Sequence, residues 1–152
     1  MNLIWGLDGE VAAVICQAAG VKGREFGPSR ALACIDNGHL IGGAIVHDWN
    51  PEAQTAEVSA GFLRRRAPHR AIARVLAEYV FGQMDCQAVI LRTDSRNSAV
   101  RRFAASMGGK EHILPRVLGR TASEAFLIIT DDAWASSKWS GRYENTLSTD
   151  AA

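Results

Sequence analysis

The sequence predicts an α/β domain with a strand–helix–strand–helix centre and antiparallel flanks, in the order αβββαβαββ. Two observations carry this prediction. Apolar residues recur with helical spacing in some segments and form short β-rich runs in the others. The chain also has 152 residues, of which 47% are hydrophobic and 22% charged, the size and composition of one globular domain with its own core.

A helix and a hairpin are predicted first. Residues 8–19 begin with acidic side chains and stop at Gly20, which is the pattern of a helix with an acidic cap and a glycine end. Two β-rich runs, 30–36 and 39–49, flank the dipeptide Asn37-Gly38. Asn-Gly between apolar runs is the strongest short-range signal for a hairpin. A turn then leads to a third strand.

The third strand, residues 54–63, is followed by a change of period at Pro68. Apolar side chains then recur on one helical stripe: Ile72, Val75, Leu76, Tyr79 and Val80. A short strand at 88–91 comes next. The sequence therefore predicts a strand that feeds directly into a helix, and a further strand after it.

The last third of the chain is predicted to hold one helix and two strands. The helix follows capping residues that end at Asn97, and it stops at Gly108-Gly109. The strands lie near 110–117 and 124–130, before an acidic turn that carries Trp134. We expect a single domain over residues 1–135 and a flexible tail over 136–152.

Composition limits the compartment and the partners. The three cysteines, Cys16, Cys34 and Cys86, have the spacing of neither a metal clip nor a disulfide framework, so each is predicted to be a buried thiol in a reducing compartment. No signal-peptide pattern and no membrane-spanning run occur, so we expect a cytoplasmic protein without a membrane partner. A net charge of +1 disfavours a nucleic-acid partner.

Basic residues gather where the third strand meets its helix. Arginine outnumbers lysine fourteen to three, and one junction carries Arg64, Arg65, Arg66, His69, Arg70 and Arg74. The first amides of a helix lack intrahelical partners and lie at the positive end of its dipole, so they bind anions. The sequence therefore predicts a site for a pyrophosphate and a further phosphate. The alternative is a charged turn that only faces water.

This junction resembles the signature of the GNAT acetyltransferase superfamily, similar to Arg/Gln-x-x-Gly-x-Gly/Ala, whose backbone amides hold the pyrophosphate of acetyl-CoA. The matching segment is Pro68, His69, Arg70, Ala71, Ile72 and Ala73, followed by Arg74. It departs from the signature at three positions. Ala71 and Ala73 replace glycines, and Pro68 replaces the leading Arg or Gln.

A second resemblance lies further along the chain. Family members place an Asn after the fifth strand and a Gly after the next helix, and here Asn97 and Gly108 keep that separation. The resemblance covers residues 32–134 and is nearest to the short phage and bacterial members, more distantly to the ribosomal-protein N-terminal acetyltransferase branch. It implies a GNAT-like mixed, mostly antiparallel central sheet with helices on both faces.

The resemblance also implies a reaction. The protein is expected to be an acetyl-CoA-dependent N-acetyltransferase in which a primary amine of a small molecule or polypeptide attacks the thioester directly. A backbone N–H near Gly61, Phe62 or Leu63 is expected to polarise the thioester carbonyl. The expected acetyl-CoA contacts are Phe62, Leu63, His69, Arg70, Ala71, Ile72, Ala73, Arg74 and Asn97.

For proton transfer, the sequence offers a candidate general base but no general acid. Glu57, on the strand 54–63, is the expected general base, with His47 and Asp48 as lower-ranked alternatives. Many family members use a tyrosine as the general acid, and Ala104 occupies that position here. The leaving thiolate is then protonated by water.

Two other functions stay open at this point. The missing glycines and Ala104 suit a binding or structural protein that keeps the fold without turnover. Further arginines extend the basic set and suit a nucleic-acid-directed acetyltransferase: Arg92, Arg96, Arg101 and Arg102. The sequence specifies neither the amine acceptor nor the oligomeric state, for which a homodimer is one option.

Overall fold

Four antiparallel strands and two helices form the first of the two units into which the chain divides, at Leu76 and Ala77. The computed structural model describes residues 1–140. In the first unit the sheet order is β1-β2-β3-β4, with each neighbouring pair antiparallel. Its elements are β1 (Asn2–Trp5), α1 (Asp8–Ala19), β2 (Ser29–Asp36), β3 (His39–Asn50), β4 (Thr55–Phe62) and α2 (His69–Ala77).

The hairpin between β2 and β3 is confirmed. Asn37 has φ 49° and Gly38 has φ 77°, so both turn residues are left-handed, as a type I′ turn requires. The sequence did not predict β1, which pairs with β2 from Asn2 opposite Ile35 to Trp5 opposite Leu32. Four residues are too few for an alternating pattern to distinguish a strand from a loop.

The predicted bounds of α1 are confirmed, and Gly20 ends it in the left-handed conformation with φ 69°. The predicted acidic cap is wrong. Leu7 occupies the cap position without a side-chain hydrogen bond. The Oδ1 atom of Asp8 instead accepts a hydrogen bond from the Ala31 amide at 3.1 Å. The carboxylate therefore joins the start of the helix to β2.

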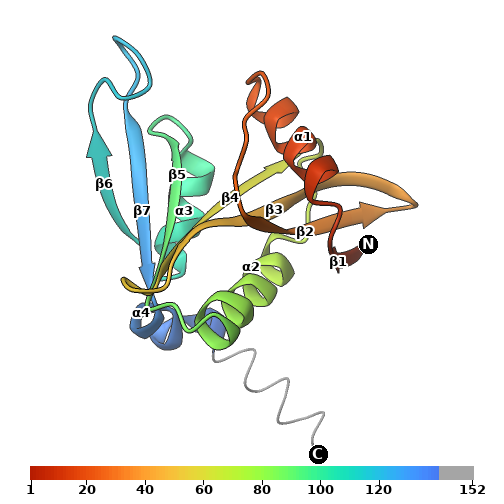
Figure 1. The fold of residues 1–152 in the computed structure, drawn as a ribbon. Coiled ribbons are helices and arrows are strands. Elements are labelled where there is room, and N and C mark those ends of the chain that lie inside the picture. The colour runs from red at the N-terminus through yellow and green to blue at the C-terminus, as the bar shows by residue number, and fades with distance from the viewer. Residues whose placement is uncertain (141–152) are drawn as a thin grey trace, which may run out of the picture. The chain divides into compact units, whose positions relative to one another are not determined.

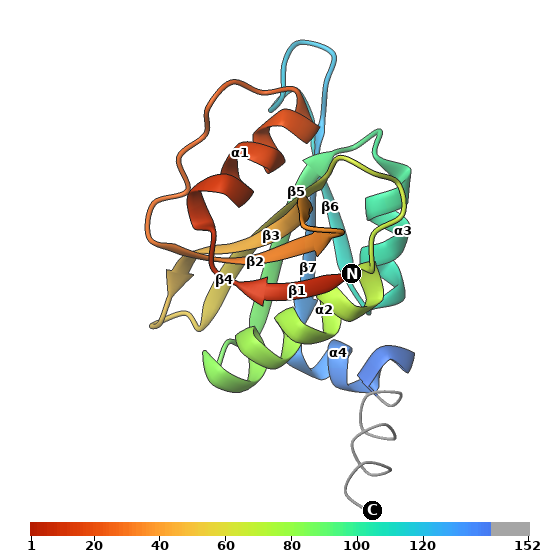
Figure 2. The same ribbon diagram turned by 90° about the vertical axis from the view of Figure 1, so that its right-hand side faces the viewer.

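Helix α1 covers one face of this sheet and α2 lies on the other (Figures 1 and 2). The core under α1 consists of Val11, Ile15, Ala31, Ala33 and Ile45. Glycines let the helix approach closely. A Cβ atom at Gly61 on β4 would lie only 2.9 Å from the Cα atom of Ile15, and one at Gly43 on β3 would lie 2.9 Å from Cγ1 of Val11.

The second unit begins with a π-helix that continues from α2, and three strands and two further helices follow it. The sheet order within it is β5-β7-β6, and both pairs are antiparallel. Helix α3 packs against β6 and β7. Its elements are η1 (Glu78–Gln83), β5 (Ala88–Asp94), α3 (Ser98–Ser106), β6 (Lys110–Leu114), β7 (Glu124–Thr130) and α4 (Asp131–Ser136).

The end of the described chain is packed rather than loose. The side chain of Trp139 is 3% exposed, and its Nε1–H donates to the Ser106 carbonyl oxygen at 3.1 Å. Its ring meets Phe103 edge to face at 5.8 Å. Packing therefore continues past residue 135, where the tail was expected to begin. Residues 141–152 of that expected tail lie outside the described residues.

The α/β class predicted from the sequence is confirmed. Within residues 1–140, no helix has the length and apolar character needed to cross a membrane. All three cysteines are free and buried, as predicted. Burial raises the pKa of the Cys34 and Cys86 thiols, which makes them poor nucleophiles.

Replacing Gly61 with alanine tests the close approach of α1 to β4. Because the added methyl group meets the backbone of Ile15, we expect Gly61→Ala to lower the free energy of unfolding by about 1–3 kcal/mol. The matched control is Gly9→Ala on α1 itself, where nothing lies within 4 Å of an added Cβ. That variant should be neutral or up to about 1 kcal/mol more stable. Equal urea midpoints for the two variants would contradict the packing described.

Candidate functional site

The connection from β4 to α2 leaves one helix amide without an acceptor. Two amides are engaged: that of His69 donates to the Ala67 carbonyl at 2.8 Å, and that of Ile72 donates to the Pro68 carbonyl at 3.0 Å. The Ala71 amide has no hydrogen-bond acceptor among residues 1–140. An open amide at the positive end of a helix is a donor for an anion.

An aromatic contact holds the two ends of this connection together. The rings of Phe62, the last residue of β4, and His69, the first of α2, meet edge to face at 5.0 Å and 85°. The Leu63 amide donates to the Ile41 carbonyl at 2.8 Å, so it is engaged within the sheet. Amides alternate in direction along a strand, so the Phe62 amide points to the edge of β4 away from β3. Of the amides expected to polarise a carbonyl, that of Phe62 therefore has the suitable direction.

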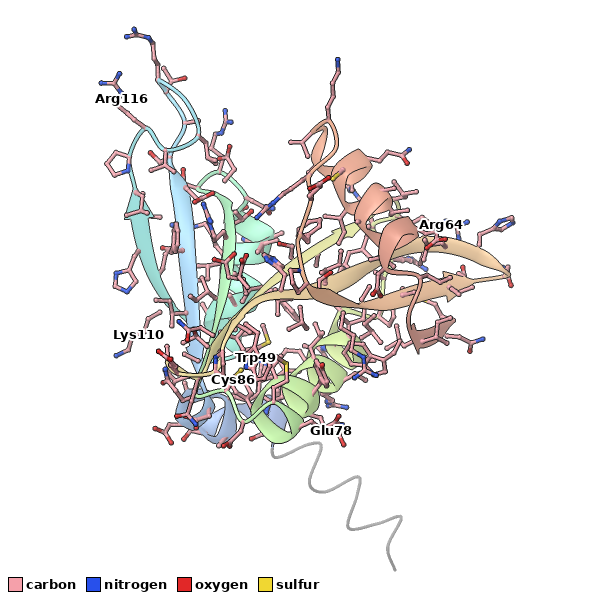
Figure 3. The ribbon with its side chains drawn as sticks, in the orientation of Figure 1. Trp49, Arg64, Glu78, Cys86, Lys110 and Arg116 are labelled. Carbon is pink, nitrogen blue, oxygen red and sulfur yellow. The ribbon has the colours of Figure 1, made fainter. Side chains whose placement is uncertain are left out.

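The basic residues of the junction differ in their pairing. Arg64 donates to Asp36 Oδ2 at 2.9 Å (Figure 3). Arg65 and Arg66 are exposed, and neither forms an ion pair with any residue that the structure describes. On α2, the Nε atom of Arg74 is buried and has no hydrogen-bond partner in the described part of the chain. The junction therefore combines exposed cations, an open amide and one unsatisfied buried donor.

A second polar group lies on the α1 face of β3 and β4. His47 is opposite Glu57 in the register, and Ile45 is opposite Ser59. Directly opposed residues point to the same face, so His47, Glu57 and Ser59 share the face of the core residue Ile45. His47 is 1% exposed, and its Nε2 lies 2.8 Å from Ser59 Oγ.

An irregularity in β3 adds a fourth side chain to this group. The register shifts between His47 and Asn50, and Asp48 is left-handed with φ 48°. Asp is one of the few residues that tolerate this conformation. Adjacent strand residues normally point to opposite faces, but here Asp48 Oδ2 lies 2.7 Å from His47 Nδ1. The bulge therefore turns the Asp48 carboxylate toward the buried imidazole.

The two ring nitrogens of His47 have different hydrogen-bond partners. A carboxylate only accepts, so Nδ1–H of neutral His47 donates to Asp48, and Nε2 accepts from the Ser59 hydroxyl. Oε2 of Glu57 lies 4.0 Å from Nδ1, and the Glu57 side chain is 19% exposed. The Phe26 ring, from the loop after α1, meets the His47 ring at 5.0 Å and 64°. The buried His47 is thus in contact with Ser59 and Glu57 on β4 and with the exposed Asp48 on β3.

Ser59 was not predicted, although the sequence holds a signal for it. Glu57 and Ser59 are two residues apart on one strand, so they must share a face. The part played by Asp48 had no such signal, because it depends on the bulge. We refer below to His47, Asp48, Glu57 and Ser59 as the β3–β4 polar cluster.

Asn97, in the second unit, caps α3. Its Oδ1 accepts from the Val100 amide at 3.3 Å, and its Nδ2 donates to Thr93 Oγ1 at 3.2 Å. Both ends of the side chain are therefore used within the protein. Ala104, on the same helix, is 1% exposed, so position 104 presents no group to solvent.

Three of the four arginines that extend the basic set, Arg92, Arg96 and Arg101, pair with carboxylates. Arg92 pairs with the buried Glu124 at 2.9 Å, and Arg101 pairs with Glu111. Arg96 binds both oxygens of Asp94, and these hydrogen bonds lower the pKa of the Asp94 carboxyl to about 2. Paired arginines offer little charge to phosphates, so the basic stripe expected for a nucleic-acid partner does not form there.

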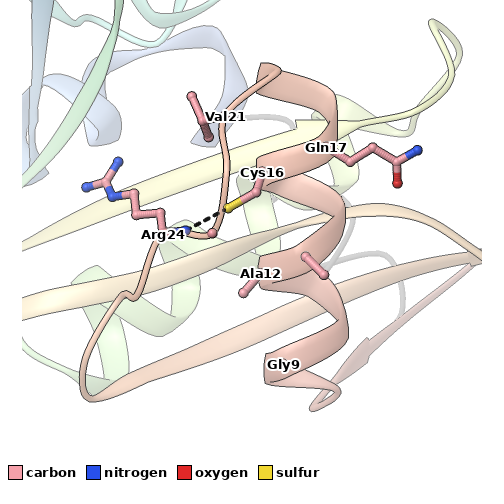
Figure 4. Close-up of a pocket in the computed structure, with 8 residues that line it drawn as sticks. Gly9, Ala12, Cys16, Gln17, Val21 and Arg24 are labelled. Atoms are coloured by element: carbon pink, nitrogen blue, oxygen red, sulfur yellow. Dashed lines mark hydrogen bonds between the residues drawn. The ribbon is translucent and has the colours of Figure 1, made fainter.

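An open groove of about 420 Å³ runs along α1 and the loop that follows it (Figure 4). Its lining is mostly small and apolar, with Gln17 and Arg24 as the polar members. The Arg24 amide, which donates to Cys16 Sγ at 3.4 Å, holds the loop beside the helix. The loop belongs to the segment from Gly20 to Pro28, and it also carries Phe26.

Solved acetyltransferase structures share this fold. A mutant form of spermidine N-acetyltransferase SpeG from Vibrio cholerae superposes with a TM-score of 0.71 at 14% identity, over 90% of this chain and 98% of the other. A dodecameric structure of spermidine N-acetyltransferase from Vibrio cholerae superposes with a TM-score of 0.73 at 13% identity, over 89% of this chain and 96% of the other. A probable acetyltransferase gives 0.59 at 17% identity, over 70% of this chain and 62% of the other. No family model matches the sequence, and the search of curated proteins found no match.

Removing the cap of α3 tests the structural use of Asn97. Because Asn97→Ala leaves the Val100 amide without its acceptor, we expect the free energy of unfolding to fall by about 0.5–2 kcal/mol. Asn97→Asp keeps an acceptor at the cap and should retain most of the stability. Urea denaturation measures both variants. An Asn97→Ala protein as stable as the parent would show that the cap contributes nothing.

Proposed function

We propose that this chain, which has the GNAT fold of known acetyltransferases, is an acetyl-CoA-dependent N-acetyltransferase that acts on a primary amine. One observation carries the proposal: at the junction of β4 and α2, the Ala71 amide and the cations Arg65 and Arg66 have no partners among residues 1–140. In this fold the proposal assigns that junction to the diphosphate of acetyl-CoA. The proposed contact segment is completed by His69, Arg70, Ile72, Ala73 and Arg74, with Phe62 and Leu63 before it.

The anion site has the physical features that a diphosphate needs. The dipole of α2 and the open amide favour negative charge, and guanidinium groups bind phosphate oxygens through parallel hydrogen bonds. Ala71 and Ala73 replace the glycines of the family signature, but both have helical backbone conformations that alanine adopts without strain. In the proposed site the open Ala71 amide and the guanidinium groups make the contacts, so the loss of the glycines is compatible with binding.

Bound acetyl-CoA supplies an acyl group on a good leaving thiolate. In the proposed reaction the amine nitrogen bonds to the acetyl carbon, and the carbon–sulfur bond breaks. The Phe62 amide donates to the carbonyl oxygen as negative charge develops on it. Glu57 accepts one proton from the ammonium group, so that the neutral amine can attack, and the second proton that the nitrogen loses passes to water. Water protonates the thiolate, since Ala104 offers no acid.

The acceptor is proposed only as an amine cation. Solved enzymes of the same fold carry the name spermidine N-acetyltransferase, so spermidine belongs in the first panel of amines. Glu57 and the exposed Asp48 supply negative charge that attracts a cation. A cytoplasmic location is part of the same proposal, and the free cysteines support it.

A protein that binds acetyl-CoA without turnover is the second candidate. The specific observation in its favour is the burial of Ala104, which leaves the position of the usual acid without a functional group. Release of free thiol across a panel of amines separates the two candidates. Thiol release that depends on both acetyl-CoA and an amine supports the enzyme.

Binding of acetyl-CoA tests the proposed anion site. We expect acetyl-CoA to raise the melting temperature, because a ligand that binds only the folded state stabilises it by mass action. Replacing both exposed cations, Arg65→Gln with Arg66→Gln, should weaken binding about 10-fold or more, since each charge-assisted hydrogen bond contributes roughly 1.5–3 kcal/mol.

The control for this experiment is Arg120→Gln, which removes an exposed arginine from the loop between β6 and β7. Its affinity for acetyl-CoA should equal that of the parent. Unchanged melting at saturating acetyl-CoA would overturn the proposed cosubstrate. Equal weakening by the control and the double variant would overturn the assignment of the junction.

Substitution of the proposed base tests its role in turnover. We expect Glu57→Gln to lower kcat by about 10²–10⁴-fold and to leave the KM for acetyl-CoA nearly unchanged, because proton transfer contributes only to the transition state. Glu52→Gln, in the exposed turn before β4, is the matched control. Steady-state thiol release with the best amine of the panel measures both. A fully active Glu57→Gln enzyme would remove Glu57 from the mechanism.

A further inference from the structure

Three potential metal ligands come together in the β3–β4 polar cluster. His47 Nδ1 and one carboxylate oxygen each from Asp48 and Glu57 all lie within 4.8 Å of one another. Within residues 1–140 this is the one group of three His, Cys, Asp or Glu side chains with that property. We propose that His47, Asp48 and Glu57 bind a single divalent transition-metal ion of the Zn²⁺ type.

The spacing of the three atoms suits one small ion. Zinc binds imidazole nitrogen and carboxylate oxygen at about 2.0–2.2 Å, so tetrahedral ligand atoms lie roughly 3.3–3.5 Å apart. The observed separations from Nδ1, 2.7 Å to Asp48 Oδ2 and 4.0 Å to Glu57 Oε2, lie on either side of that range. Binding of one ion therefore requires the Asp48 carboxylate to move away from Nδ1 and the Glu57 carboxylate to move toward it.

The imidazole is already oriented by a partner on its other nitrogen. Metal-binding histidines usually donate their second ring N–H to an acceptor, which fixes the ring and its tautomer. Here Ser59 Oγ lies 2.8 Å from Nε2, and the Phe26 ring packs against the imidazole. When the ion replaces the proton on Nδ1, Nε2–H donates to the Ser59 hydroxyl, which reverses that hydrogen bond. Ser59 is therefore a positioning residue for the proposed site.

The cluster also has an entry path and a donor set that selects the class of metal. The Asp48 side chain is 65% exposed on its bulge, whereas His47 is 1% exposed, so an ion can enter from the side of Asp48. One imidazole with two carboxylates suits Zn²⁺ and its first-row neighbours, while Ca²⁺ and Mg²⁺ prefer oxygen ligands alone. Three protein ligands leave a fourth position for water.

Occupancy of this site has a consequence that rests on the proposed function. Glu57 cannot accept a proton from an amine while its carboxylate binds a metal ion. Zn²⁺ at saturating concentration should therefore inhibit acetyl transfer without displacing acetyl-CoA. Whether the metal ion binds does not depend on whether the protein transfers acetyl groups.

Direct binding tests the site. Untagged, chelator-treated full-length protein is titrated with Zn²⁺ by calorimetry and with Co²⁺ by visible absorption. We expect one ion per chain and absorption typical of low-coordinate Co²⁺. His47→Gln and Asp48→Asn should each weaken Zn²⁺ binding at least 100-fold, and Ser59→Ala by about 10–100-fold.

Matched controls separate the cluster from ordinary surface binding. His39→Gln removes the exposed histidine at the other end of β3, and Glu52→Gln removes an exposed carboxylate. Both variants should bind Zn²⁺ with the affinity of the parent protein. Asp48→Asn changes an exposed side chain, so it remains informative if His47→Gln fails to fold. Absence of binding at 1:1, or binding that Asp48→Asn leaves unchanged, overturns the metal site.

The two proposals fail separately. Zinc binding without a melting shift by acetyl-CoA supports the metal site and overturns the cosubstrate. A rise in melting temperature with acetyl-CoA, without zinc binding, supports the cosubstrate and overturns the metal site. Inhibition of thiol release by Zn²⁺ in the parent, and its loss in Asp48→Asn, supports the connection between them.

Discussion

The antiparallel register of β3 and β4 is the constraint on which the rest of the site depends. It places His47 opposite Glu57 and Ile45 opposite Ser59, so polar and core side chains share one face of the same strand pair. The same register joins the Leu63 amide to the Ile41 carbonyl and thereby directs the Phe62 amide the other way. A slip of β4 by one residue would move Glu57 and Ser59 to the face opposite His47.

Close packing of α1 maintains that register. The helix lies on Gly43 and Gly61, where any side chain would meet backbone or core atoms. Its buried residues Val11 and Ile15 cover the strand pair up to Ile45, and the loop that follows brings Phe26 against His47. The transition from apolar core to polar cluster therefore occurs within two residues of one strand. Stability and chemistry depend on the same strands.

Basic and acidic side chains lie at different places in the first unit. The exposed guanidinium groups of Arg65 and Arg66 lie at the start of α2, while the carboxylates of Asp48 and Glu57 lie beside His47. In the second unit, Arg92, Arg96 and Arg101 are instead paired with acids. A net charge of +1 therefore conceals a basic junction before α2 and a pair of carboxylates beside His47, because a sum over the chain does not show where the charges lie.

The sequence by itself determined the class of fold, most helix and strand bounds, the Asn37-Gly38 turn and the basic junction, because periodicity, turn residues and local charge act over a few neighbouring residues. It also indicated Glu57. Only the tertiary structure decided which side chains meet His47: Glu57 and Ser59 through the register of β3 with β4, and Asp48 through a left-handed bulge. Asn97 illustrates the same limit, since its use as a cap depends on the geometry at Val100. Contacts between distant residues follow from register and packing, which no local pattern encodes.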